Sequence, residues 1–172
     1  RYLLKIFPNQ AKTNHLLVMS SLWLVCDVSG SMLEGGKRFI VRTLVYQVAQ
    51  FYQLGYAQNR EIKIVAWNNQ IKMIPWISGD EVPGEILDCS GSSNVDVLVQ
   101  LCGEHVDDQF IVFSDGFWSE SPQFALKECQ IALNQGGICF VSVGFDANSK
   151  LKGQNVFKPE DFFSIVEGWL EK

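Results

Sequence analysis

A continuous apolar segment at residues 22–26 is followed at once by Asp27, Ser29 and Ser31, spaced two residues apart. An uninterrupted apolar strand is typical of a parallel sheet that is buried on both faces. Ligand sites in such sheets lie beyond the carboxyl ends of the strands. A carboxylate and two hydroxyls are hard oxygen ligands of the kind that Mg²⁺ and Mn²⁺ prefer. The segment therefore predicts an α/β fold with a metal site at one edge of its sheet.

Strand-like and helix-like segments alternate along the rest of the chain, which indicates a parallel sheet with helices on both faces. Residues 61–67 and 70–77 flank a polar turn and predict a hairpin, so one edge strand is expected to be antiparallel. The long segment 78–93 is rich in Gly, Asp, Pro and Ser and is expected to be a loop. The other predicted elements are helices at 37–54, 95–102, 122–134 and 159–170 and strands at 110–113 and 138–143. We expect a doubly wound, mostly parallel central sheet.

Length and charge limit the possible classes of protein. The 172 residues fit one domain, which we place at 21–172, preceded by an extension or edge strand at 1–20. A net charge of −5 without a basic run argues against nucleic-acid binding and against a polybasic membrane patch. No apolar stretch reaches the roughly 18 to 20 residues of a membrane span. The five cysteines include no C-x-x-C pair, so we expect a reduced, cytoplasmic protein.

Two further loops carry oxygen ligands that parallel strands would bring to the same edge. Ser93 precedes the predicted helix at 95–102, and Asp115 follows the predicted strand at 110–113. Each residue has an ordinary structural alternative: Ser93 suits a helix N-cap, and Asp115 suits a type I turn. The D-x-S-x-S segment alone also suits a capped turn. Together, the three loops favour a metal site, and no lysine is expected near it.

These motifs resemble those of the von Willebrand factor type A (vWA) domain over residues 22–170. Asp27-Val28-Ser29-Gly30-Ser31 matches the D-x-S-x-S motif of that family, and Asp115-Gly116 matches its aspartate after the fourth core strand. Ser93 stands where the family usually has Thr, which keeps the hydroxyl but loses the methyl group that restricts its rotamer. The resemblance implies a Rossmann-like fold with a metal-ion-dependent adhesion site (MIDAS). It implies that Ser29, Ser31 and Ser93 ligate Mg²⁺ or Mn²⁺ directly, with Asp27 and Asp115 acting through water.

The function predicted on this basis is metal-dependent protein–protein interaction. The resemblance implies a partner that supplies an acidic residue to the metal. Fold-level analogy with bacterial, intracellular vWA proteins suggests an AAA+ ATPase of MoxR type as that partner, within a larger multidomain or multi-subunit system. One alternative is a metal-dependent phosphohydrolase that uses Asp27, although Ser29 stands where such enzymes usually have a second acid. A metal-free scaffold is another, and the sequence favours a protein without enzymatic activity.

Three residue groups near these motifs have two possible roles. Phe117 and Trp118 follow the third loop and suit either a partner-binding hot spot or packing onto the core. Asp107 and Asp108 are expected to be solvated surface charges. His105 lacks metal-ligand spacing, so a structural or surface role is the default.

Overall fold

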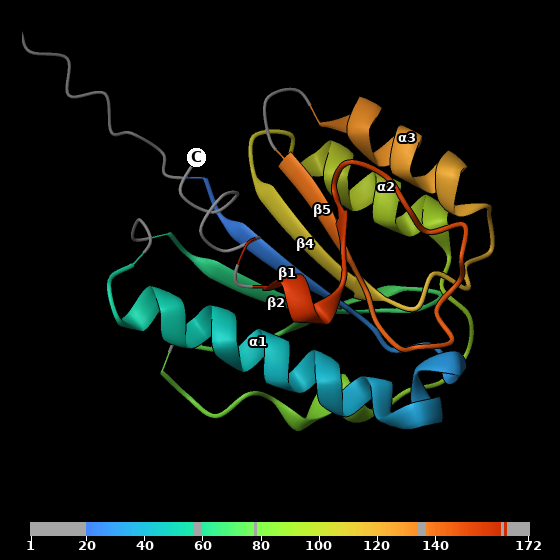
Figure 1. Cartoon of the computed structure of the whole chain (residues 1–172). Coiled ribbons are helices and arrows are strands. Elements are labelled where there is room, and N and C mark those ends of the chain that lie inside the picture. The colour runs from blue at the N-terminus through green and yellow to red at the C-terminus, as the bar shows by residue number, and fades with distance from the viewer. Residues whose placement is uncertain (1–19, 57–59, 78, 134–136, 163, 165–172) are drawn as a thin grey trace, which may run out of the picture.

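A six-stranded sheet forms the centre of the computed structural model, which describes residues 20–56, 60–77, 79–133, 137–162 and 164. Figure 1 shows its parallel strands lying side by side between the helices. The strand order is β3-β2-β1-β4-β5-β6, and every neighbouring pair is parallel except β2 with β3. The strands are β1 (Leu22–Asp27), β2 (Ile62–Trp67), β3 (Ile71–Ile74), β4 (Gln109–Ser114), β5 (Gly137–Ser142) and β6 (Val156–Phe157). The predicted mostly parallel sheet with one antiparallel edge strand is confirmed.

Helices cover both faces of the sheet, as predicted. α1 (Lys37–Gln53) lies on one face, and α2 (Val95–Glu104) and α3 (Pro122–Ala132) lie on the other (Figure 1). Leu22, Leu24 and Cys26 of β1 face the α1 side, whereas Trp23 and Val25 face the α2–α3 side. Because successive side chains of a strand point to opposite faces, a strand buried on both faces must be apolar throughout.

Short 3₁₀ helices complete the fold: η1 (Gly30–Gly36), η2 (Gly84–Leu87) and η3 (Pro159–Asp161). η2 lies within the expected loop at 78–93. The helix expected at 159–170 begins as η3, and most of its remainder lies outside the described residues, as do residues 1–19 of the predicted N-terminal extension. β6 was not predicted, because two residues are too short to show an alternating pattern.

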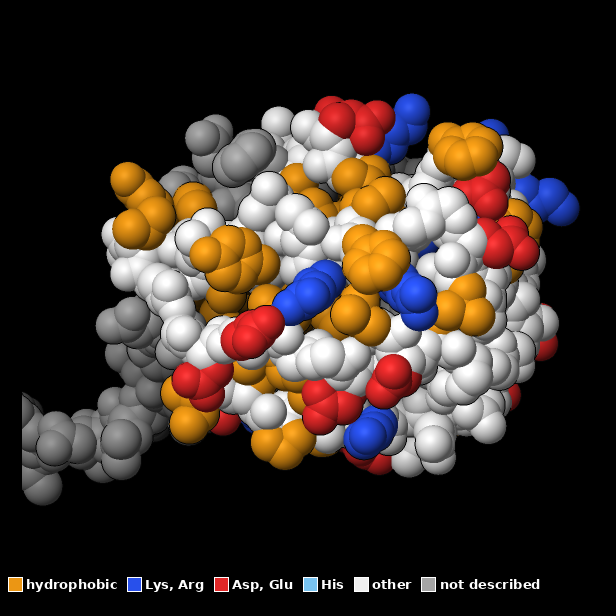
Figure 2. All heavy atoms as spheres, turned by 90° about the horizontal axis from the view of Figure 1, so that it is seen from below, with side chains coloured by type: hydrophobic (Ala, Val, Ile, Leu, Met, Phe, Trp, Pro, Cys, Tyr) orange, Lys and Arg blue, Asp and Glu red, His pale blue; other side chains and the backbone are white. Residues whose placement is uncertain are grey.

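The outer surface on the α1 side is mixed in character. Figure 2 shows hydrophobic side chains there interspersed with charged ones. Phe39 and Tyr46 of α1 are each about half exposed, and Arg42 forms an ion pair with Glu81 at 2.9 Å. No helix in the described part of the chain is long and apolar enough to cross a membrane.

Asp108 fixes the amino-terminal end of β1, opposite the edge where the motifs lie. Its Oδ1 accepts a hydrogen bond from the Ser21 backbone at 2.8 Å, and its Oδ2 accepts one from Trp23 Nε1 at 2.8 Å. The ring of His105 packs against Trp23, with the ring centroids 4.4 Å apart. The expectation that Asp108 is a solvated surface charge is therefore wrong, whereas Asp107 is exposed.

We expect Asp108→Ala to lower the free energy of unfolding by about 1–3 kcal/mol, because it leaves two partly buried N–H groups without an acceptor. Urea unfolding followed by tryptophan fluorescence would measure this. Asp107→Ala is the matched control and should change the free energy by less than about 0.5 kcal/mol. Equal effects of the two substitutions would contradict the structural role of Asp108.

Candidate metal site

Asp27 is the last residue of β1, and its carboxylate joins three segments of the chain. Its Oδ1 accepts hydrogen bonds from the Ser29 backbone N–H and from Ser93 Oγ, both at 2.9 Å. Its Oδ2 accepts a short hydrogen bond from Ser114 Oγ, at the end of β4. The side chain is 1% exposed. Asp27 therefore caps its own turn, as the structural alternative predicts, and also holds the other two loops.

Backbone hydrogen bonds fix the first loop against the second. The Gly30 N–H donates to the Gly91 carbonyl at 2.9 Å, and the Ser90 N–H donates to the Val28 carbonyl at 2.7 Å. Within the first loop, the hydroxyls of Ser29 and Ser31 lie 3.2 Å apart, at hydrogen-bonding distance. Two backbone hydrogen bonds thus join the first loop to the second.

Ser93 has no capping role on α2. The N-cap is Asn94, whose side chain accepts a hydrogen bond from the Asp96 N–H at 2.9 Å. The Ser93 side chain is fully buried and directs its hydroxyl to Asp27, whereas Ser92 is exposed. The N-cap alternative for Ser93 is therefore wrong, and its hydroxyl belongs to the cluster around Asp27.

Asp115 directly follows β4 and is also fully buried. Its Oδ1 accepts a hydrogen bond from the Phe117 backbone at 3.2 Å, which is the geometry expected of a turn aspartate. Its Oδ2 accepts one from Lys37 Nζ at 2.9 Å. The Asn148 N–H donates to the Asp115 carbonyl at 2.8 Å, so the third loop is held by the connection between β5 and β6.

Lys37, the first residue of α1, was missed by the sequence reasoning. The expectation that no lysine lies near the site is wrong, because Lys37 pairs with Asp115 and also with Asp146, at 3.0 Å. No local sequence pattern identifies Lys37 as a site residue, because a lysine at the start of a helix ordinarily lies at the surface. This lysine is only 1% exposed. Asp146 was missed for the same reason, since only the folded chain brings it to the site.

Burial and pairing shift the pKa values of these groups in defined directions. Burial raises the pKa of Asp27 above its ordinary value, although hydrogen bonds from Ser114, Ser29 and Ser93 oppose the rise. Burial lowers the pKa of Lys37, but its bonds to Asp115 and Asp146 outweigh this and raise the pKa overall. The hydrogen bond from Lys37 lowers the pKa of Asp146. Lys37 is therefore held in its charged form.

The two aromatic residues after the third loop have different roles. Trp118 packs against Trp67 and Phe140, with ring centroids 5.8 and 5.5 Å away, and its Nε1 donates to Ser114 Oγ at 2.7 Å. Phe117 is 49% exposed. The core-packing alternative therefore applies to Trp118, which supports the hydroxyl that contacts Asp27. Phe117 remains available at the surface beside the site.

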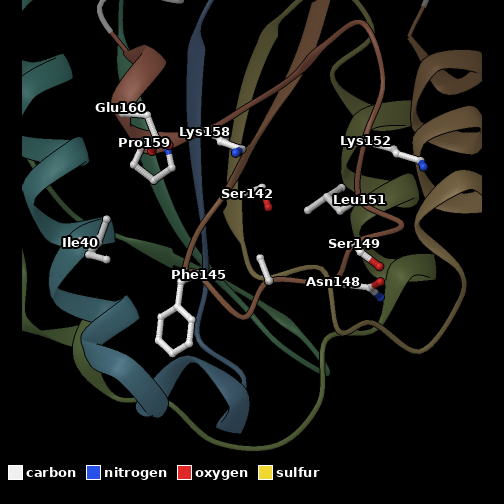
Figure 3. A pocket seen from close by; sticks show the side chains of 12 residues that line it. Ile40, Ser142, Phe145, Asn148, Ser149, Leu151, Lys152, Lys158, Pro159 and Glu160 are labelled. Atoms are coloured by element: carbon white, nitrogen blue, oxygen red, sulfur yellow. The ribbon is translucent and has the colours of Figure 1, made fainter.

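A cleft of about 650 Å³ lies beside this cluster but does not contain it. Figure 3 shows Ile40 of α1, Phe145 of the β5–β6 connection and Pro159 of η3 around it. None of the five predicted metal ligands lines the cleft. Of those five, Ser31 is the one with partial exposure, so the cluster reaches solvent at the first loop.

Comparison with known proteins supports the fold through structure alone. No protein-family model matches the sequence, and no curated protein matches it. A vWA protein from Catenulispora acidiphila superposes with a TM-score of 0.55 at 15% identity, over 87% of this chain and 42% of that chain. Manganese-loaded TRAP protein from Plasmodium vivax has a TM-score of 0.59 at 12% identity, over 90% and 74%. The chain has a vWA fold.

Another structure with this fold is proximal thread matrix protein 1 from the mussel byssus, with a zinc-occupied MIDAS motif. It has a TM-score of 0.54 at 12% identity, and the match covers 87% of this chain and 46% of that one. The present chain thus spans less than half of two of these three proteins. Two of these three neighbours hold a metal, manganese in TRAP protein and zinc in proximal thread matrix protein 1.

The donor set of this vWA fold fits a hard divalent cation held mainly by hydroxyls. Three serine hydroxyls and two carboxylates come from three loops, and the hydrogen bonds that Asp27 accepts link the loops. Among the described residues, no group of three or more His, Cys, Asp or Glu side chains is arranged to hold a metal. Mg²⁺ commonly keeps several waters and needs only one or two carboxylates. The residues present therefore suit Mg²⁺ or Mn²⁺ rather than a thiolate- or imidazole-bound metal.

Gly116, in the third loop, is required by the geometry of the site. Its φ is +79°, and a Cβ there would lie 2.9 Å from Leu151 Cδ2. We expect Gly116→Ala to cost about 1–3 kcal/mol of unfolding free energy, because backbone strain and overpacking act together. Gly103→Ala, in α2 with open space around it, is the control and should be neutral or stabilising by up to about 1 kcal/mol. Chemical denaturation of both variants would test this difference.

Proposed function

We propose that this chain is a divalent-metal-dependent protein–protein interaction module, with Ser29, Ser31 and Ser93 as direct ligands of Mg²⁺ or Mn²⁺. Asp27 and Asp115 orient the cation through bound water. The observation that carries this proposal is the convergence of three loops on the Asp27 carboxylate at the carboxyl edge of the sheet. The metal-loaded neighbours with the same fold support it.

A ligand set dominated by neutral hydroxyls leaves most of the charge of the cation uncompensated. Such a cation attracts a further anionic ligand, which a partner protein supplies as an Asp or Glu side chain. Because Ser31 is the partly exposed member of the set, the open coordination position faces solvent at the first loop. Metal binding and partner binding are then coupled through one shared ion.

The surroundings of Asp27 argue against the phosphohydrolase alternative. Both of its carboxylate oxygens already accept hydrogen bonds, and the side chain is almost fully buried. A nucleophilic carboxylate needs an oxygen that faces the substrate. One neighbour with the same fold, proximal thread matrix protein 1, has a zinc-occupied MIDAS motif. We therefore place this protein among interaction modules and not among enzymes.

The cellular setting belongs to the same proposal. All five cysteines are free thiols, and four of them are buried, which suits a reducing cytoplasmic compartment. An AAA+ ATPase of MoxR type remains our proposed partner, on fold-level analogy. A purified ATPase of that class, mixed with this chain in Mg²⁺ or in chelator, would test the pairing directly.

We expect the metal-stripped protein to bind Mn²⁺ at one site and Asp27→Ala to abolish that binding, because Asp27 both orients the cation and holds the three loops. Ser93→Ala should weaken Mn²⁺ binding by about tenfold or more, because the cation loses one oxygen ligand. Ser92→Ala, one residue away and exposed, is the matched control and should bind as the unchanged protein does. Electron paramagnetic resonance of free Mn²⁺ would measure the Mn²⁺ affinity of all four proteins.

Circular dichroism would establish that each variant is folded. If Ser92→Ala and Ser93→Ala lowered Mn²⁺ affinity equally, the second loop would not supply the proposed ligand. If the unchanged protein bound no Mn²⁺ even with added carboxylate, the chain would be a metal-free scaffold and the proposed function would be wrong.

A further inference from the structure

Lys37 reaches the candidate metal site from the start of α1 and ends between two carboxylates. Its Nζ lies 2.9 Å from Asp115 Oδ2 and 3.0 Å from Asp146 Oδ2, with the Ser31 carbonyl at 3.4 Å. The Lys37 side chain is 1% exposed, so water does not screen its charge from Asp115. The Lys37 ammonium group therefore already pairs with one carboxylate oxygen of Asp115, which we propose as an anchor of the metal.

The surrounding backbone is shaped to admit this side chain. Gly144, which follows β5 by two residues, has a φ of +100°, and a Cβ there would lie 2.8 Å from Lys37 Cε. On its other side, the ammonium group lies 5.9 Å from the centre of the Phe117 ring. The position of Lys37 is thus fixed by close packing along its length and not only by its ion pairs.

The charge of Lys37 acts against a second cation at the same site. It compensates one of the two carboxylates, Asp27 and Asp115, that would otherwise attract the metal. Asp146 offsets part of this effect, but its side chain is 36% exposed and its charge is screened by solvent. A cation held by the three hydroxyls would therefore find a site with little net negative charge.

We propose that Lys37 is a positioning residue that keeps the metal affinity of the free site low, so that the ion is held firmly only when a partner carboxylate joins it. This inference rests on the proposed function and specifies how its site is regulated. The missing negative charge is then supplied from outside the chain. The metal is thus retained while an acidic partner is bound and dissociates readily in its absence.

The test compares Mn²⁺ affinity with and without saturating acetate, which serves as the carboxylate probe. For the unchanged protein, acetate should tighten Mn²⁺ binding. Lys37→Met removes the charge but keeps most of the apolar stem, so it should bind Mn²⁺ about tenfold or more tightly without acetate. The enhancement by acetate should shrink in this variant. Lys37→Arg retains the charge and should keep the weak, acetate-dependent binding.

Two controls separate charge from folding. Lys63→Met removes a lysine from β2, at the opposite end of the sheet, and should leave Mn²⁺ affinity and acetate dependence unchanged. Lys37→Gln, which retains a hydrogen-bond donor for Asp115, replaces Lys37→Met if the latter fails to fold.

Thermal unfolding gives a second readout. Mn²⁺ should raise the melting temperature of the uncharged variant more than that of the unchanged protein, because the ion then compensates an otherwise unpaired Asp115.

The outcomes are distinguishable. If the unchanged protein binds Mn²⁺ but the folded, uncharged variant binds it equally or more weakly, Lys37 merely supports the structure and this inference is overturned alone. If neither protein binds Mn²⁺, with or without acetate, the proposed function fails together with the inference. Tighter binding with a smaller acetate effect supports both.

Discussion

The candidate site depends on the buried carboxylate of Asp27 at the end of the central strand. A buried carboxylate is costly unless it is hydrogen-bonded, and Asp27 meets this requirement with donors from the loop after β1, the loop before α2 and the end of β4. The residue that would orient a cation is therefore also the residue that assembles the loops. These hydrogen bonds hold two of the proposed ligand residues, Ser29 and Ser93, beside Asp27.

Local patterns were sufficient to predict most of the fold. α1 was predicted at 37–54 and is found at 37–53, because apolar residues at helical spacing and Gly55 define it directly. β1 and β4 were predicted because burial on both faces makes a strand continuously apolar. The five predicted site residues lie on the three predicted loops, since parallel strands necessarily bring their carboxyl ends to one edge. Their role as metal ligands stays a prediction.

What the sequence did not predict arises from contacts between distant segments. Lys37 and Asp115 are 78 positions apart, and nothing in the sequence around Lys37 distinguishes it from a surface lysine. Trp118 and Phe117 are adjacent, yet one packs on Trp67 and the other is half exposed, a division that only the folded chain determines. The hydrophobic periodicity of a segment predicts its own secondary structure. The roles of Lys37, Phe117 and Trp118 depend instead on which distant segments pack against them.

The two edges of the sheet restrict how another protein can approach it. β3 has four residues, with Lys72 exposed within it and Pro75, which lacks a backbone donor, directly after it. β6 has only two residues. Short edge strands bearing lysine or followed by proline discourage the addition of a foreign strand. Pairing of a foreign strand with either edge of the sheet is thereby disfavoured in the described part of the chain, so the row of unpaired backbone groups at each edge is a poor template for aggregation.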